Sequence, residues 1–133
     1  MEAFVFFRMA YREEEAQRLR NTLWELGIEA REIKMMGGCC FMVDDKMCLG
    51  VLTEKGSEKD YLMARLGPTA AQEALASPGV RPMDFTGRSM KDYVFIDQEI
   101  LQDDEALLHW IQLALAFNPF AKASKRRKRK LKD

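Results

Sequence analysis

The chain has 133 residues, of which 47% are hydrophobic and 32% are charged. This length and apolar content suit one globular domain and leave too few residues for two ordinary ones. No apolar run approaches the length of a membrane span, and residues 1–8 lack the basic leader and cleavage site of a signal peptide. We therefore expect a cytoplasmic protein that is not attached to a membrane.

The formal net charge of zero conceals an uneven distribution along the chain. Residues 122–133 hold eight basic residues and one acidic residue, a net charge of +7, whereas the other 13 basic and 20 acidic residues give the rest of the chain −7. The partners of the acidic body and of the basic tail therefore have to be considered separately.

Residues 12–26 are expected to form the first helix. Glutamates at 13–15 favour its N-terminal end, and Gly27 suits the left-handed position that follows a helix. A strand over 31–36 is predicted next, and Gly37-Gly38 break it. The apolar residues that recur on one face of this helix are Ala16, Leu19, Leu23 and Leu26.

Two strand-like segments, 39–43 and 46–52, flank Asp44-Asp45 and predict a hairpin with a two-residue turn. Both faces of this hairpin are largely apolar, so we expect it near the centre of a sheet that is covered at least partly on both sides. The predicted register pairs Val43 with Lys46, Met42 with Met47 and Phe41 with Cys48.

The second half of the chain predicts a strand over 61–66, a short helix that starts at Gly67-Pro68 and runs to about Ala76, and strands over 80–85 and 93–96. A last helix begins at Asp103 or Asp104 and ends before Asn118-Pro119. Its expected buried stripe consists of Leu107, Trp110, Ile111, Ala114 and Phe117.

The order of these elements indicates an α+β fold. We expect two layers, in which N- and C-terminal helices and a short middle helix accompany a mostly antiparallel sheet. The predicted organisation is an N-terminal extension over residues 1–8, a single domain over 9–120 and a basic, disordered tail over 121–133.

Several short motifs, in the same order and without large gaps, resemble the TfoX N-terminal domain family over roughly residues 9–118. The family's longest motif resembles residues 81–88, followed by Met90-Lys91 and Tyr93-Val94. The resemblance implies an α+β fold with one layer of helices on one sheet. The other segments that carry it are 34–38, 47–51, 65–68 and 103–107.

The chain departs from this family in three places. Asp44-Asp45 stands where the family usually has an Asx-Gly turn, and residues 1–8 precede the position where many relatives begin. The larger competence regulator of the family carries a second, DNA-binding-like domain, whereas here the basic tail follows. We therefore do not expect the competence role to apply.

No catalytic or metal-binding constellation emerges from the residues. The only histidine, His109, lies beside Trp110 in the last helix, where a position flanking the buried stripe is the better interpretation than a catalytic role. Cys39 and Cys40 should point to opposite faces of a strand, so that with Cys48 they are better core thiols than zinc ligands. We expect no metal, no disulfide, no cofactor and no enzymatic activity.

One group of residues suggests a small anion site. The helix after Gly67 offers free backbone N–H groups, and Arg65, Arg81 and Arg88 supply positive charge if the sheet brings them together. The alternative is that these arginines stabilise turns or pair with nearby carboxylates. Such a site would make the chain an anion or ligand sensor, or an enzyme that the motifs do not reveal.

The basic tail predicts weak, sequence-independent contact with nucleic acid through phosphate neutralisation. It contains no aromatic side chain for base stacking, and its alternative role is a solvated end that affects solubility. The residues expected to contact phosphates are Lys125, Arg126, Arg127, Lys128, Arg129 and Lys130.

These observations favour a non-enzymatic regulatory or interaction module with a basic tail. The anion sensor remains the alternative. Neither the identity of a protein partner nor the oligomeric state follows from the sequence.

Overall fold

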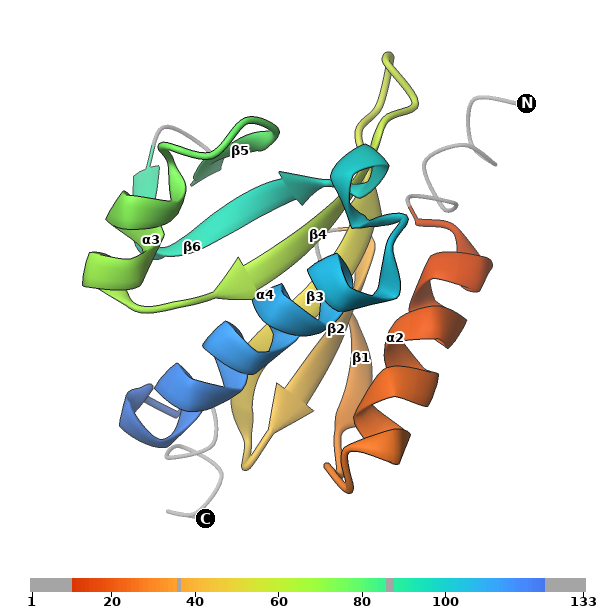
Figure 1. Cartoon of the computed structure of the whole chain (residues 1–133), viewed down its shortest axis with the longest axis vertical. Helices are drawn as coiled ribbons and strands as arrows, with labels where there is room; N and C mark the ends of the chain where they lie inside the picture. Colours follow the sequence, from red (N-terminus) through yellow and green to blue (C-terminus); the bar gives the residue numbers. More distant parts are fainter. Residues whose placement is uncertain (1–10, 36, 86–87, 124–133) are drawn as a thin grey trace, which may run out of the picture.

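The computed structural model describes residues 11–35, 37–85 and 88–123 (Figure 1). In these ranges the chain forms a six-stranded antiparallel sheet with strand order β1-β2-β3-β4-β6-β5. The strands are β1 (Arg31–Met35), β2 (Gly38–Val43), β3 (Lys46–Thr53), β4 (Asp60–Arg65), β5 (Val80–Phe85) and β6 (Arg88–Asp97). The α-helices are α2 (Glu13–Glu25), α3 (Pro68–Ala74) and α4 (Asp104–Phe117), and short 3₁₀ helices occupy η1 (Gln98–Leu101) and η2 (Asn118–Phe120).

The described helices all lie on one face of the sheet, which gives the expected two layers. Figure 1 shows α4 crossing this face and α2 running alongside it. Their apolar residues join those of the strands in one large cluster, in which Leu19, Leu23, Trp110 and Ile111 are at most 8% exposed. The α+β class predicted from the element order is therefore confirmed.

The opposite face of the sheet carries a second apolar cluster. It contains side chains from the strands alone and is rich in aromatic residues and methionine. Its buried members are Cys40, Tyr61, Met63, Met83, Tyr93 and Phe95. Apolar side chains on both faces account for the uniformly buried pattern of β2 and confirm that the hairpin is central.

The β2–β3 hairpin follows the predicted register only near its turn. Val43 pairs with Lys46 and Met42 with Met47, but a bulge shifts the register so that Phe41 faces Leu49 and not Cys48. The predicted Phe41–Cys48 pair is therefore wrong, because a bulge places two residues of one strand opposite one residue of the other.

Several element boundaries also differ from the prediction. The short helix ends at Ala74 and β6 starts earlier, at Arg88. Leu26 is 38% exposed because it caps the end of α2 and does not continue its buried stripe. Phe117 is half-buried and packs on Gly67. The Thr86-Gly87 turn, residues 1–8 and most of the basic tail lie outside the described residues.

Candidate functional site: a cleft between α2 and the β2–β3 turn

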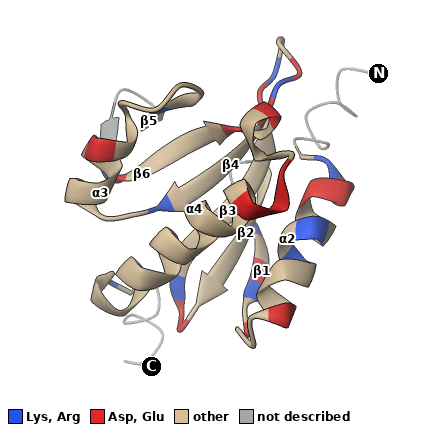
Figure 2. Ribbon diagram, viewed as in Figure 1, with Lys and Arg blue, Asp and Glu red and all other residues tan. Residues whose placement is uncertain are grey.

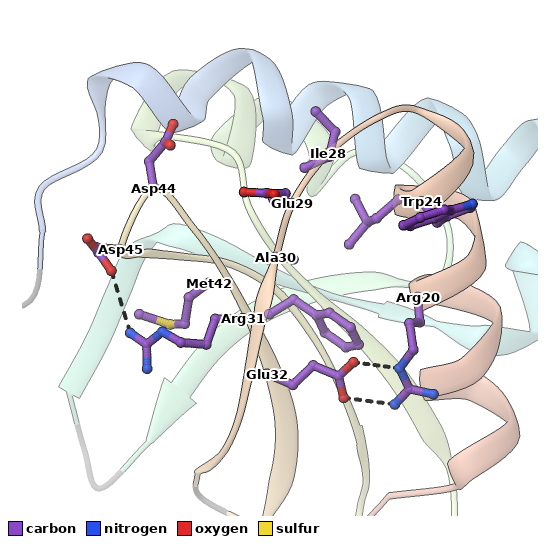
Figure 3. A pocket seen from close by; sticks show the side chains of 12 residues that line it. Arg20, Trp24, Ile28, Glu29, Ala30, Arg31, Glu32, Met42, Asp44 and Asp45 are labelled. Atoms are coloured by element: carbon purple, nitrogen blue, oxygen red, sulfur yellow. Dashed lines mark hydrogen bonds and ion pairs between the residues drawn. The ribbon is translucent and has the colours of Figure 1, made fainter.

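A cleft of about 560 Å³ opens between the C-terminal half of α2, the segment that leads into β1 and the β2–β3 turn (Figure 3). Its volume falls within the range of about 300–1,000 Å³ that is usual for ligand pockets. The cleft reaches around the first residues of β1, because Glu32 and Phe41 project to the helix-covered face and Arg31 and Met42 to the other.

The inner wall of the cleft is apolar and the rim carries an exposed aromatic ring. Leu23 and Phe41 are 2% and 1% exposed and form part of the main core. Trp24 lies one residue beyond Leu23, away from the buried stripe of α2, and is 82% exposed. A single exposed apolar side chain is ordinary on a protein surface, but a tryptophan on the rim of a cleft is a typical anchor for binding.

The charged residues of the cleft are predominantly acidic. Four carboxylates and two guanidinium groups line it, a net charge of −2. Arg31 lies 3.6 Å from Asp45, and Arg20 pairs with Glu32. Among the residues that the structure describes, Glu29 and Asp44 form no ion pair, and both are exposed. The cleft therefore offers two uncompensated carboxylates beside an aromatic ring.

A bidentate ion pair fixes one wall of the cleft. Arg20 donates from Nε to Glu32 Oε2 at 2.5 Å and from a terminal nitrogen to Glu32 Oε1 at 2.8 Å, which ties α2 to β1 (Figure 3). The hydrogen bond from Arg20 lowers the pKa of Glu32 below its usual value, so this carboxylate stays ionised. The Arg20–Glu32 ion pair holds α2 against β1 at the wall of the cleft. Because Asp45 pairs with Arg31, Glu29 and Asp44 are the carboxylates of the lining that are open to a ligand.

The backbone of the β2–β3 turn places Asp44 and Asp45 at the edge of the cleft. Both residues have positive φ, 53° and 65°, as a two-residue turn of type I′ requires. Aspartate tolerates this conformation better than most residues, although glycine adopts it more readily. Two carboxylates at this turn therefore add negative charge to the edge of the cleft.

The lining of the cleft combines carboxylates, guanidinium groups and apolar side chains. Its described lining contains no histidine, cysteine, serine, threonine or lysine. Across the described ranges, no group of three or more His, Cys, Asp or Glu residues has an arrangement that could hold a metal ion. An aromatic rim and unpaired carboxylates instead fit a ligand with basic and apolar groups.

Arg65, a member of the predicted anion site, lies at the end of β4, where a carboxylate, an aromatic ring and two backbone carbonyls already contact its guanidinium group. Its Nε lies 3.5 Å from Asp92 Oδ2, its guanidinium stacks 5.2 Å from the centre of the Tyr93 ring, and it donates to the Met47 and Lys122 carbonyls. The nearby Gly67 packs against the ring of Phe117. A β-carbon at position 67 would lie only 2.5 Å from Cδ1 of this ring, so the contact requires glycine.

Arg81 shares the face of Arg65 but occupies a different part of it. Its guanidinium lies 4.5 Å from the centre of the Tyr61 ring, and it pairs with Glu54 at 3.3 Å. Tyr61 is four residues from Arg65 along β4, about 13 Å at the usual rise of a strand. The described geometry thus gives each arginine its own carboxylate and does not bring the two together. The Arg88 side chain lies outside the described part, so the anion site stays a prediction.

The remaining candidates occupy positions in the core or on its edge. His109 is exposed on α4 beside Trp110. Cys39 and Cys48 lie in the helix-side cluster and Cys40 in the opposite one, as strand alternation predicts. Burial raises the pKa of Cys40 to about 11 and that of Cys48 to about 12, which keeps both thiols protonated at neutral pH.

The chain enters its basic tail close to the cleft. Asn118 donates from Nδ2 to the Val43 carbonyl at 3.1 Å, and Lys46 Nζ lies 3.1 Å from the Asn118 carbonyl. Val43 and Lys46 are the residues that flank Asp44-Asp45. The predicted nucleic-acid contacts at 125–130 lie outside the described residues, but the point from which the tail departs is beside the β2–β3 turn.

Sequence reasoning did not identify the cleft. One signal was present, because Trp24 is a large apolar residue outside the helical stripe of α2. Glu29, Asp44 and Asp45 carried no such signal, since they come from a connecting segment and a turn that only the tertiary structure brings together.

Comparison with known families bears on these observations. The TfoX N-terminal domain family matches residues 27–118, which include β1–β6, α4 and most of the cleft. No curated protein and no solved structure matches the chain. Within the described ranges, no helix is both long and apolar enough to cross a membrane. The match spans well over half of the 133 residues, and the chain therefore belongs to the TfoX N-terminal domain family.

Proposed function

We propose that this protein is a non-enzymatic interaction module whose cleft between α2 and the β2–β3 turn binds a basic peptide segment of a protein partner. At a coarse level, membership of the TfoX N-terminal domain family supports a regulatory or interaction role. The observation that carries the finer proposal is the combination of the 82%-exposed Trp24 with the unpaired Glu29 and Asp44 around an apolar-walled cleft.

The chemistry of the cleft favours cations over other ligands. An anionic ligand would meet a net charge of −2, and both arginines of the lining already pair with carboxylates. A lysine or arginine side chain instead gains a carboxylate and an aromatic face, and an adjacent apolar residue can bury surface against the inner wall. Trp24 would act as the anchor, because tryptophan dominates the energetics of many interfaces.

The test uses a synthetic peptide of alternating Lys-Arg pairs and leucines, titrated calorimetrically into the full chain. A second peptide with glutamate at each basic position serves as the charge control. We expect the basic peptide to bind and the acidic peptide not to bind. Binding should protect Trp24 from quenching by acrylamide, whereas Trp110, which is 8% exposed, contributes a nearly constant background.

A pair of matched variants locates the binding site. Glu29→Gln/Asp44→Asn should weaken binding of the basic peptide, since each exposed ion pair contributes up to about 1 kcal/mol. Glu73→Gln/Asp103→Asn changes the net charge equally at exposed positions away from the cleft and should leave the affinity unchanged. Equal weakening by both double variants would show that the peptide responds to the overall charge and not to the cleft.

Contact between the basic tail and nucleic acid is a second candidate function. Its support is the charge density of residues 122–133, where eight of twelve residues are basic. Such a segment binds phosphates by releasing counterions and does not read sequence. The test is whether nucleic-acid binding is lost when residues 122–133 are removed.

A further inference from the structure

We propose that the ligand of the cleft is the chain's own C-terminal segment, residues 124–133, which docks there and competes with basic segments of other molecules. This inference rests on the proposed function, because it assigns an occupant to the same cleft. It adds a regulatory property, since a docked tail would occupy the cleft and withhold its own cations from nucleic acid.

The starting point of the tail is the first observation that supports this inference. Asn118 is bonded to the carbonyl of Val43, Lys46 contacts the carbonyls of Asn118 and Pro119, and Arg65 contacts that of Lys122. These contacts hold residues 118–122 near the turn end of the β2–β3 hairpin and the end of β4. The acidic turn of the same hairpin is one edge of the cleft.

The length of the tail is sufficient for it to reach the whole cleft. Ten residues follow the last described residue, and an extended chain of that length spans at most about 33–36 Å, more than the diameter of a small domain. Trp24 and Asp44 line one continuous cleft, so the tail can pass both without any movement of the domain.

Charge complementarity is the second observation. Residues 124–133 contain seven basic residues and one acidic residue, whereas the cleft has a net charge of −2 with Glu29 and Asp44 unpaired in the described structure. Arginine and lysine also stack on exposed tryptophan, and Leu131 supplies one large apolar side chain. Figure 2 shows the other acidic clusters, at the starts of α2 and α4, at the end of the domain remote from the exit of the tail.

Tethering makes even a weak contact significant. A short flexible linker gives a local concentration on the order of 1 mM, so a cleft that binds a free basic peptide at about 0.1 mM would be occupied by its own tail roughly nine-tenths of the time. An external basic peptide would then bind the full chain about tenfold more weakly than it binds a chain whose tail cannot dock.

The experiment compares the full chain with a full-length variant in which the six basic residues at 125–130 are replaced by glutamine. The probe is the same Lys-Arg-Leu peptide, titrated at low ionic strength because salt screens exposed charges. We expect the glutamine variant to bind the probe about tenfold more tightly. Its Trp24 should also be more strongly quenched by acrylamide before any peptide is added.

The cleft variants complete the comparison within the full chain. Glu29→Gln/Asp44→Asn should expose Trp24 to acrylamide as the tail variant does, and Glu73→Gln/Asp103→Asn should not. Equal probe affinity for the full chain and the tail variant would overturn this inference and leave the proposed function intact. Failure of both chains to bind the probe would contradict the proposed function itself.

Dilution distinguishes the chain's own tail from that of a second copy. Protection of Trp24 that is unchanged over about a hundredfold dilution supports docking within one chain, since a tethered segment keeps its local concentration. Protection that disappears on dilution would overturn docking in the same chain and assign the cleft to the tail of another molecule.

Discussion

The two tryptophans of this chain have opposite roles although both lie on helices. Trp110 is 8% exposed in the main cluster between α4 and the sheet, whereas Trp24 is 82% exposed on the rim of the cleft. Burial of an aromatic side chain contributes to folding, and an exposed one contributes only when a ligand covers it. Substitution of Trp110 is therefore expected to affect the stability of the fold, and substitution of Trp24 to affect ligand binding.

Trp110→Ala should lower the free energy of unfolding by about 3–5 kcal/mol, because it leaves a cavity in the core. Trp24→Ala should change it by no more than about 0.5 kcal/mol, as is usual for surface substitutions. Urea unfolding followed by circular dichroism measures both values. A loss of less than 1 kcal/mol for Trp110→Ala would contradict the packing of α4 described above.

Gly67 is the residue at which backbone conformation and packing are constrained together. It has φ of 89° and ψ of 161°, a conformation that residues with a β-carbon rarely adopt, and it lies against the ring of Phe117. It thereby connects the start of α3 to the end of α4.

Gly67→Ala should destabilise the fold more than Gly56→Ala does. Gly56 also has positive φ, 94°, but no atom lies within 4 Å of the position where its β-carbon would be. Backbone strain of about 1–3 kcal/mol applies to both substitutions, while only Gly67→Ala forces the Phe117 ring to move. Thermal unfolding of the two variants gives the comparison, and equal effects would show that the Phe117 contact contributes nothing.

At the scale of single elements, the β2–β3 turn combines a strained backbone with negative charge. Asp45 has φ of 65°, a conformation that glycine adopts most readily, and it lies 3.6 Å from Arg31. Asp45→Gly should therefore be more stable than Asp45→Ala by about 1 kcal/mol, because both remove the carboxylate and only alanine keeps a β-carbon in the left-handed region. The difference in urea midpoints tests this expectation, and equal midpoints would argue against a left-handed residue at this position.

The connection between α2 and β1 should give the fold a defined dependence on acid. The hydrogen bond from Arg20 lowers the pKa of Glu32 below its usual value of 4.5. A lowered pKa means that the ion pair contributes its full stability above pH 4.5 and loses it as the pH falls through the lowered value. Glu32→Gln removes this contribution at all pH values.

The measurement is the unfolding free energy of the wild type and Glu32→Gln as a function of pH. We expect the wild type to be the more stable protein near neutral pH and the two curves to converge in acid. Curves that stay parallel throughout would show that protonation of Glu32 does not contribute to acid unfolding.

At the scale of the whole molecule, the opposed charges of body and tail determine what the chain can bind. Removal of residues 122–133 should leave the fold intact, because the charge density of this segment disfavours burial in a core. The full chain should bind duplex DNA weakly and without sequence preference. The remaining body, at −7, should not bind DNA.

Fluorescence anisotropy with a labelled duplex over a series of salt concentrations is the measurement. Affinity should fall with salt, with a log–log slope of roughly −0.9 for each phosphate that the tail neutralises. Binding that survives removal of the tail would instead locate the contact in the folded domain and strengthen the alternative at Arg81 and Arg88.

Local sequence patterns determined most of the fold. The apolar spacing of Ala16, Leu19 and Leu23 defined α2, the two-residue Asp44-Asp45 turn defined the hairpin, and successive motifs identified the family. These features depend on residues that are close in the chain, where helical and strand periodicity directly report burial. The bulge at Cys48 of β3 escaped prediction, because the segment from Met47 to Leu49 looks like regular alternation in sequence.

Only the tertiary structure decided which side chains meet. Trp24 from α2, Glu29 from a connecting segment and Asp44 from a turn form one cleft, whereas Arg65 and Arg81, two members of the predicted anion site, each pair with a different carboxylate. The sequence by itself determined the family, the charge division and the element order. The cleft followed from the packing of α2 against β1 and β2, since residues distant in the chain become neighbours only when the apolar faces of their elements are buried against one another.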